Sequence, residues 1–460
     1  MRIRFALVCL VLFLTASAVL RTARAAEKPR FRLATFSADV TIPLNHRCMG
    51  LLPTKSKKIV DPLYAHGFVL LGSEEPIVLC AVDWCEIRNG AYDQWRETLA
   101  SAAGTTRDRV LVCSLHQHDA PVTDAGAAKL LTSVGLEGEL YDEAFHRETL
   151  QRLAIALKDC LGDAQTITHL GLGQARVEGV ASNRRVEYPD GRVSFGRGSR
   201  SGSDEFLANA PDGLIDPFLK SISFWNGDKP VAALHAYATH PMSYYGRGEV
   251  TSDFVGLARE RRQRDDFSVK QIYVSGCSGD VTAGKFNDGS QETRLVLIDR
   301  IYQAMVDAWE DTKLVALDRV KFRTTTFELE YHPSPKLTEE ALAAVLRDEQ
   351  QTVENRIYAA MSLSSRERVA AHQPIDLPCI DFGSAQIVLF PGEAFVGYQL
   401  MAQQMLPNSF VLSIGYGECW PGYIPTSSAF ADDFQDTWLW VAPGSEQRIR
   451  SALEQVLTAR

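Results

Sequence analysis

The chain has 460 residues, of which 45% are hydrophobic, and a formal net charge of −9. This composition is typical of a globular protein with a sizeable core. The acidic balance argues against nucleic acid as a partner, because affinity for phosphate backbones comes largely from Lys and Arg.

The first 25 residues have the pattern of an export signal. Arg2 and Arg4 precede an apolar run over residues 5–20, and Ala23-Arg24-Ala25 matches a signal peptidase site. The run is shorter than the roughly 20 residues that cross a bilayer, and no later stretch is as apolar. We therefore predict a signal peptide over residues 1–25 and export to the periplasm or outside the cell. The mature chain, with no transmembrane segment, has a charge of −13 because four arginines leave.

Strand-like and helix-like apolar patterns alternate along the remaining residues 26–460. In chain order they predict strands at 67–71 and 77–82, a helix at 91–102, a strand at 109–114, a helix at 141–161, strands at 219–224, 230–237 and 271–274, a helix at 291–309, a strand at 321–329, a helix at 338–360, a strand at 385–390 and a helix at 446–457. Thr338 and Ser445, each followed by acids, are predicted helix N-caps.

This alternation predicts one large catalytic domain of the α/β (mixed α+β) class, with layered, mostly mixed β-sheets and outer helices. The segment 177–217, rich in Arg, Gly, Ser and Asp, is predicted to be a long surface excursion. Such a loop in a compact domain is usually functional or disordered.

Eight cysteines remain after the predicted signal peptide, without any CxxC pair. We expect most of them to be small buried side chains, and export permits one or two disulfides. They are Cys48, Cys80, Cys85, Cys113, Cys160, Cys277, Cys379 and Cys419.

Two histidines follow the buried strand predicted at 109–114. His116 and His118 are spaced i, i+2, so both imidazoles can reach one site where the chain turns out of the strand. Imidazole is the commonest nitrogen ligand for zinc. Taken alone, the pair is equally well explained as two polar residues in an ordinary loop.

A third histidine follows the strand predicted at 230–237. His240 is placed like a ligand, whereas His235 lies within the strand and is expected to be structural. Asp253 follows soon after and has two interpretations. It could orient a histidine or move a proton, or it could be the N-cap of a helix over 257–261.

Three further segments offer polar groups near strand ends. Gly276 and Gly279 lie in a tight turn that would let backbone N–H groups approach a substrate. Glu393 precedes a helix predicted at 394–405, as a first-turn acid or a metal ligand. The aromatic loop 415–426 could serve packing alone. Together, two His, one Glu and a fourth ligand fit zinc with a water in reach.

The order of these motifs resembles that of the neutral ceramidase family, in its N-terminal zinc amidase domain and its smaller bacterial relatives. The resemblance covers roughly residues 36–434. Its counterparts are Asp39-Val40-Thr41-Ile42-Pro43, Leu115 to Pro121, Asn183-Arg184, His240 with Ser252-Asp253, Gly279-Asp280-Val281-Thr282, Pro391-Gly392-Glu393 and Trp420-Pro421-Gly422-Tyr423.

The resemblance implies a zinc hydrolase. Zn²⁺ would be bound by His116, His240, Glu393 and Tyr423, and a water activated by the metal would attack an amide or ester carbonyl. The substrate would be a small-molecule or lipid amide, such as N-acyl sphingosine or another N-acyl amide.

Other residues gain roles from the same resemblance. His118, Arg184 and the Thr282 hydroxyl would line the reaction centre. His118 or Asp253 would move the proton, and Arg184 or Tyr423 would stabilise the developing oxyanion.

The chain departs from the family pattern at several positions. Thr282 replaces a serine, Trp420 replaces a tyrosine, and Leu115 to Ala120 reads differently from the family's Thr-His-Thr-His-Ser-Gly. The chain also leaves no room for the C-terminal β-sandwich domain of ceramidases. Two alternatives therefore stay open, a metal-dependent amidohydrolase of another family and a non-catalytic secreted binding protein. The sequence makes no prediction of oligomeric state.

Overall fold

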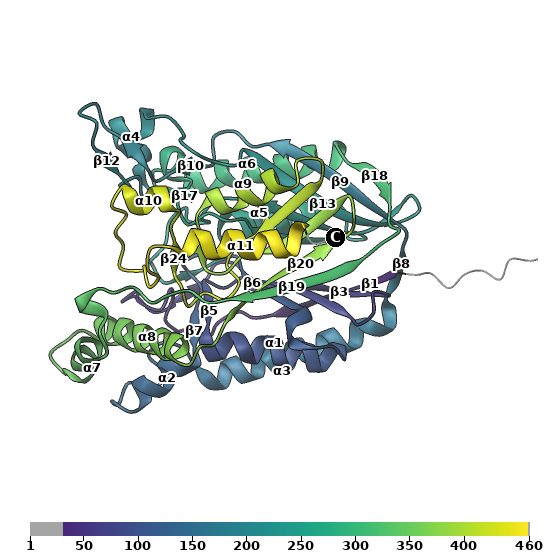
Figure 1. Cartoon of the computed structure of the whole chain (residues 1–460). Coiled ribbons are helices and arrows are strands. Elements are labelled where there is room, and N and C mark those ends of the chain that lie inside the picture. The colour runs from purple at the N-terminus through teal and green to yellow at the C-terminus, as the bar shows by residue number, and fades with distance from the viewer. Residues whose placement is uncertain (1–30, 459–460) are drawn as a thin grey trace, which may run out of the picture.

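Three mixed β-sheets with helices outside them form the body of the protein (Figure 1). The structure is a computed structural model, and it describes residues 31–458. The sheets have five, five and four strands, and this layered arrangement confirms the predicted fold class. The predicted signal peptide lies outside the described residues. Within 31–458, no helix has the length and apolar character needed to cross a membrane.

The first sheet has helices on one face and the other sheets on its opposite face. It contains β1 (Phe31–Asp39), β3 (Tyr64–Leu71), β4 (Ile77–Val82), β6 (Val110–Ser114) and β8 (Gln165–Ile167), covered by α1 (Asn89–Ala103) and α3 (Glu143–Cys160). The strand order is β6-β4-β3-β1-β8, and β4 and β6 are parallel. In β4, Val78 and Cys80 face the helices while Leu79 and Ala81 face the sheets. Burial on both faces explains why this strand is apolar throughout.

The second sheet has the order β16-β14-β13-β9-β18, with only β14 and β16 parallel. Its strands are β9 (His169–Arg176), β13 (Phe218–Asn226), β14 (Lys229–Tyr237), β16 (Lys270–Ser275) and β18 (Lys313–Ala316), with α5 (Asp253–Asp265) and α6 (Gln291–Glu310) packed against it. Gly173 allows α6 to approach closely, because a Cβ there would lie 2.0 Å from the Ala308 carbonyl oxygen.

The third sheet has the order β19-β20-β21-β23, with β21 and β23 parallel. Its strands are β19 (Lys321–Phe327), β20 (Ile375–Asp381), β21 (Ala385–Leu389) and β23 (Phe410–Ile414), and its outer helices are α9 (Val396–Met405) and α11 (Ser445–Thr458). The inner faces of all three sheets share one core. Phe68, Phe224 and Phe382 meet there, with ring centroids 5.2 Å and 6.2 Å apart.

The parallel pairs β4/β6, β14/β16 and β21/β23 end near one another. Ser114 donates its backbone N–H to Tyr416, and Gly415 donates its N–H to Ser275. The Ser275 hydroxyl donates to the Leu115 carbonyl at 2.8 Å. These bonds join the ends of strands from all three sheets. Side chains that follow those strands are therefore brought to one place.

The helix predicted at 338–360 is wrong as a single element, because two helices occupy this region. They are α7 (Glu339–Arg347) and α8 (Val353–Ala370). Asp348 accepts the backbone N–H of Gln350, and the Thr352 hydroxyl accepts the N–H of Asn355. This local turn and new N-cap interrupt the helical pattern.

One of the two predicted helix N-caps is confirmed, and the other is wrong. Thr338 caps α7 by accepting the N–H of Ala341, as predicted. Ser445 is wrong as an N-cap, since it is the first residue of α11 and its hydroxyl donates to the Ala442 carbonyl. Each of the other predicted strands and helices coincides with an observed one to within three residues at either end, except the helix suggested at 257–261, which is the longer α5 (Asp253–Asp265).

Shorter elements complete the chain, and two of them, α4 and α10, lie with α7 at one end of the molecule (Figure 1). The predicted excursion 177–217 holds four of them. The shorter elements are β2 (Lys58–Ile59), β5 (Glu86–Arg88), β7 (Val122–Asp124), α2 (Ala125–Thr132), β10 (Ser182–Asn183), β11 (Val186–Glu187), β12 (Val193–Ser194), α4 (Glu205–Asn209), β15 (Glu249–Val250), β17 (Val281–Thr282), β22 (Glu393–Ala394), β24 (Tyr423–Ile424) and α10 (Ser427–Ala431).

The eight cysteines between residues 31 and 458 are all unpaired. All except Cys160 are buried, which confirms the expectation of small buried side chains. Export permits disulfides, but the described part of the chain contains none.

Candidate functional site

The joined strand ends surround a cavity of about 320 Å³. Five residues predicted from the sequence line it: His116, His118, Arg184, Glu393 and Tyr423. The cavity wall also includes Cys85, Tyr245, Asp436 and Trp438.

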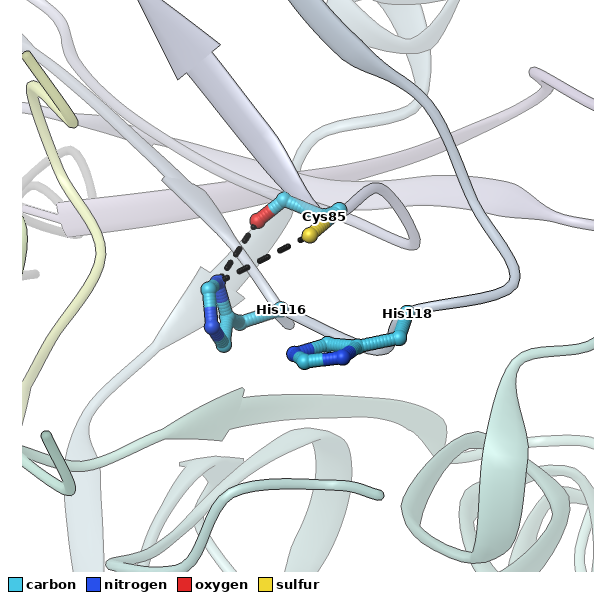
Figure 2. A group of neighbouring side chains, drawn as sticks. All are labelled: Cys85, His116 and His118. Atoms are coloured by element: carbon cyan, nitrogen blue, oxygen red, sulfur yellow. Dashed lines mark hydrogen bonds between the residues drawn. The ribbon is translucent and has the colours of Figure 1, made fainter. Parts of the chain in front are cut away.

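His116 leaves strand β6 in a left-handed backbone conformation, with φ of 73°. A side-chain-bearing residue adopts this conformation only where surrounding contacts enforce it. Its backbone N–H donates to Trp84, and its ring Nδ1 lies 3.0 Å from the Cys85 carbonyl oxygen (Figure 2). A carbonyl only accepts, so Nδ1 carries the proton. The Nε2 lone pair is therefore left for another partner.

His240 is fixed in the same way from the second sheet. Its Nδ1 donates to the Ser278 carbonyl at 2.6 Å, and its backbone N–H donates to Val281. Its side chain is fully buried. Again only Nε2 remains available.

Glu393 follows β21 of the third sheet and lies where both imidazoles point. Its Oε2 is 2.9 Å from His240 Nε2 and 3.3 Å from His116 Nε2. The ligand atoms of the three buried residues all lie within 4.8 Å of one another. In a tetrahedral zinc site with ligand distances of about 2.0–2.1 Å, neighbouring ligand atoms are about 3.3 Å apart. The three side chains therefore already have nearly the spacing of a metal site.

The protonation states favour a cation at this point. Burial, aided by Arg184, lowers the pKa of His240 to about 4. Burial opposes a charge on His116, but the Glu393 carboxylate raises its pKa above the usual value. Burial also opposes ionisation of Glu393, and the two imidazoles nevertheless hold its pKa well below the usual range. Nδ1 of each ring already donates to a carbonyl, so the Nε2 lone pair of each ring faces the Glu393 carboxylate. These lone pairs and the carboxylate oxygen would repel one another unless Nε2 is protonated or a cation lies between them.

A buried charge network adjoins this cluster. Glu86 accepts from the Trp438 indole N–H and from Arg88, each at 2.9 Å, and Asp124 lies 3.7 Å from the Arg88 guanidinium. Both carboxylates accept hydrogen bonds on both oxygens. Burial raises the pKa of Glu86 and of Asp124, and the Arg88 guanidinium opposes that rise.

His118 stands beside His116 without joining the cluster. Figure 2 shows the two rings on one loop beside Cys85, and the possible ligand atoms of Cys85, His116 and His118 lie within 4.8 Å of one another. Burial and the neighbouring histidines hold the pKa of His118 well below its usual value. Its Nδ1 is buried and has no hydrogen-bond partner among residues 31–458. The ring packs edge-on against Tyr245, with centroids 4.7 Å apart. His118 is therefore a neutral imidazole with a free nitrogen at the cavity.

Arg184 and Tyr423 form a second part of the wall. The Arg184 guanidinium lies 5.5 Å from the Tyr423 ring centroid, and strand β24 pairs Tyr423 with Glu393. Within the described residues, the buried Nε of Arg184 has no hydrogen-bond partner. This guanidinium is thus available to a ligand.

Three of the eight predicted site residues are outside the cavity lining: His240, already described, and Asp253 and Thr282. Asp253 accepts from the Ser243 backbone N–H and hydroxyl at 3.0 Å and 2.5 Å. It is the first residue of α5, and the N-cap is Ser252. Thr282 forms a backbone bridge with His240, and its buried hydroxyl has no partner in residues 31–458.

Two further residues, His235 and Tyr416, have structural roles. His235 bonds to Ser221 at 2.6 Å and to Gln271 at 2.8 Å, which confirms the expectation of a structural histidine. Tyr416, which sequence reasoning missed, stacks on the His116 ring at 4.3 Å. Its hydroxyl bonds to Ser278 at 2.7 Å. A polar aromatic residue directly after a buried strand was the available signal.

Comparison with known proteins identifies the fold. No family model matches the chain, and no curated protein matches it. A solved structure of a ceramidase complexed with C2 is similar at a TM-score of 0.66 and 15% identity. The neutral ceramidase from Pseudomonas aeruginosa is similar at 0.65 and 14%. Each comparison covers 94% of this chain and 75% of the other. The fold is therefore ceramidase-like, as the motif order predicted.

Proposed function

We propose that this protein is an exported, zinc-dependent hydrolase of amide bonds, with esters as a second class and N-acyl sphingosine or another N-acyl amide as substrate. One observation carries the proposal: His116 and His240, each anchored through Nδ1, converge through Nε2 on Glu393. The ceramidase-like fold supports hydrolysis over other uses of a metal. Export rests on the sequence, with cleavage predicted after Ala25.

His116, His240 and Glu393 would hold the zinc, and we assign the fourth position to Tyr423. Strand pairing of Glu393 with Tyr423 supports this assignment. When bound, zinc supplies Lewis-acid polarisation of a carbonyl and lowers the pKa of water. The buried carbonyl partners of both imidazoles fix the rings before any ligand arrives.

His118 is assigned the proton transfer. Its low pKa keeps the imidazole neutral, and its free Nδ1 can accept a proton at the cavity. Asp253 supports this role less well, because Ser243 occupies both of its oxygens.

Arg184 is assigned to the oxyanion that develops on the carbonyl. Its guanidinium lines the cavity and stays positively charged. The Thr282 hydroxyl remains a proposed contributor, since it is buried, unpartnered and bridged through its backbone to His240.

The mature chain tests the proposal in an assay on N-acyl amides and esters of increasing acyl length. We expect hydrolysis that a chelator abolishes and added Zn²⁺ restores. Released amine or alcohol is measured alongside zinc content. A complete lack of chelator-sensitive turnover on every substrate would favour the non-catalytic binding protein.

Gly279 offers a test of the Glu393 position. A Cβ at Gly279 would lie 2.1 Å from the Glu393 carbonyl oxygen. In Gly279→Ala the backbone of Glu393 must therefore move, and we expect lower zinc content and a free energy of unfolding reduced by about 1–3 kcal/mol.

The matched control is Gly162→Ala, because a Cβ at Gly162 has no neighbour within 4 Å. Zinc content by elemental analysis and urea unfolding measure both variants. If Gly279→Ala kept the zinc content of the wild type, the close contact between Gly279 and the Glu393 backbone would not be needed to position Glu393.

A further inference from the structure

Two guanidinium groups flank the His/Glu cluster, each over a tyrosine ring. Arg184 lies over Tyr423 at 5.5 Å, and Arg200 lies over Tyr245 at 4.9 Å. Tyr245 in turn packs against His118 at 4.7 Å. Both tyrosines line the cavity. Each positive charge thus contacts a tyrosine of the cavity wall.

Neither guanidinium is held in an ion pair within the described part of the chain, although Arg184 is close enough to Tyr423, Glu393 and Asp436 for these groups to raise its pKa against the effect of burial. Among residues 31–458, neither has a carboxylate within ion-pair distance or a hydrogen-bond acceptor for its side chain. Arg185, the neighbour of Arg184, is by contrast paired with Asp432 at 2.6 Å. Arginine offers five donors in a planar fork that suits a carboxylate, and stacking on an aromatic ring holds the fork in place.

The cavity beside the cluster is small. Its volume of about 320 Å³ lies at the lower end of the range for small-molecule sites, which is about 300–1,000 Å³. Met49, Met242 and Trp438 supply apolar wall beside the polar groups. Such a cavity suits a compact acyl amide.

We propose that the site takes compact amides bearing a free carboxylate, of which N-acyl amino acids are the simplest, and that Arg200 on Tyr245 binds this carboxylate. The inference rests on the proposed function for the hydrolytic step. Arg184 then faces the scissile carbonyl, and Arg200 determines specificity from the rim. Hydrolysis adds water across the amide, giving a carboxylic acid and the free amino acid.

The test compares N-acetyl-leucine with N-acetyl-leucine amide, which lacks only the carboxylate charge. Binding to the mature protein is measured by calorimetry after chelation, so that turnover does not interfere, and hydrolysis is measured separately with zinc. We expect the carboxylate to bind about tenfold tighter at low salt, as for a charge-assisted bidentate contact. The difference should shrink in high salt.

Arg200→Gln should remove the difference between the two ligands. The matched control is Arg192→Gln, an exposed arginine of the same excursion that stacks on Tyr188 at 4.0 Å, outside the cavity lining. This control should keep the difference.

The outcomes test the carboxylate-binding role of Arg200 separately from the proposed hydrolysis. Equal binding of both ligands, no binding of either, or a difference that survives in Arg200→Gln would overturn the assignment of Arg200. Hydrolysis of both ligands without a binding difference would sink the carboxylate inference and leave the hydrolase standing. An Arg200-dependent difference without any hydrolysis would keep the ligand class and reject the hydrolase.

Discussion

His116→Ala and Glu393→Gln proteins are expected to bind zinc at least about 100-fold more weakly than the wild type and to lose hydrolysis. Substituting residues that merely orient metal ligands already costs about 10–100-fold, so removal of a ligand should cost at least as much. Elemental analysis after dialysis and a competitive zinc titration measure this effect.

The control for these variants is His235→Gln. His235 is also fully buried and lies on β14, the strand that leads to His240, but it bonds only to Ser221 and Gln271. It should keep its zinc even if its stability falls. Full zinc in both His116→Ala and Glu393→Gln would refute the metal centre.

Asp83→Ala is expected to lower the free energy of unfolding by about 3–5 kcal/mol. Asp83 binds Arg259 through two hydrogen bonds of 2.6 Å and 2.8 Å, and both side chains are buried. It also accepts the Tyr64 backbone N–H. Asp83 follows β4 of the first sheet and Arg259 lies on α5 of the second sheet. Removing the carboxylate leaves the buried guanidinium, at the junction of two layers, with the half-buried Glu260 as its remaining acidic partner at 3.1 Å.

Arg261→Ala on the same helix is the matched control. Arg261 pairs with Asp299 at the surface and stacks on Tyr302 at 3.9 Å. Exposed ion pairs contribute about 0–1 kcal/mol, so this variant should unfold almost as the wild type does. Urea unfolding at neutral pH compares the two. A loss below about 1 kcal/mol in Asp83→Ala would show that the buried pair does not hold the layers together.

The sequence predicts the elements that are apolar and contiguous, and it misses those whose pattern is weak. Strand β4 is predicted at its observed ends because both of its faces are buried. Strand β9 is missed, since its glycines, Gly171 and Gly173, are selected by close packing rather than by strand propensity. The break between α7 and α8 depends on polar turn residues that also fit a helix surface.

The candidate site shows the same division. His116, His240 and Glu393 could be singled out because each follows a predicted strand. The sequence could not predict which nitrogen of each ring faces Glu393, because this depends on the hydrogen bonds from Nδ1 to the carbonyls of Cys85 and Ser278. Arg200 carries no motif at all. Its place is known only from the ring on which it stacks.

The three clustered side chains follow strands of three different sheets, and this has a consequence for the order of folding. His240 and Glu393 are 153 positions apart along the chain, and His116 lies on a third segment. Closing such long loops is slow, so the cation should join after the layers have assembled. Refolding rates should then be insensitive to zinc, while unfolding slows as zinc concentration rises. Zinc occupancy would report on completed assembly of all three sheets.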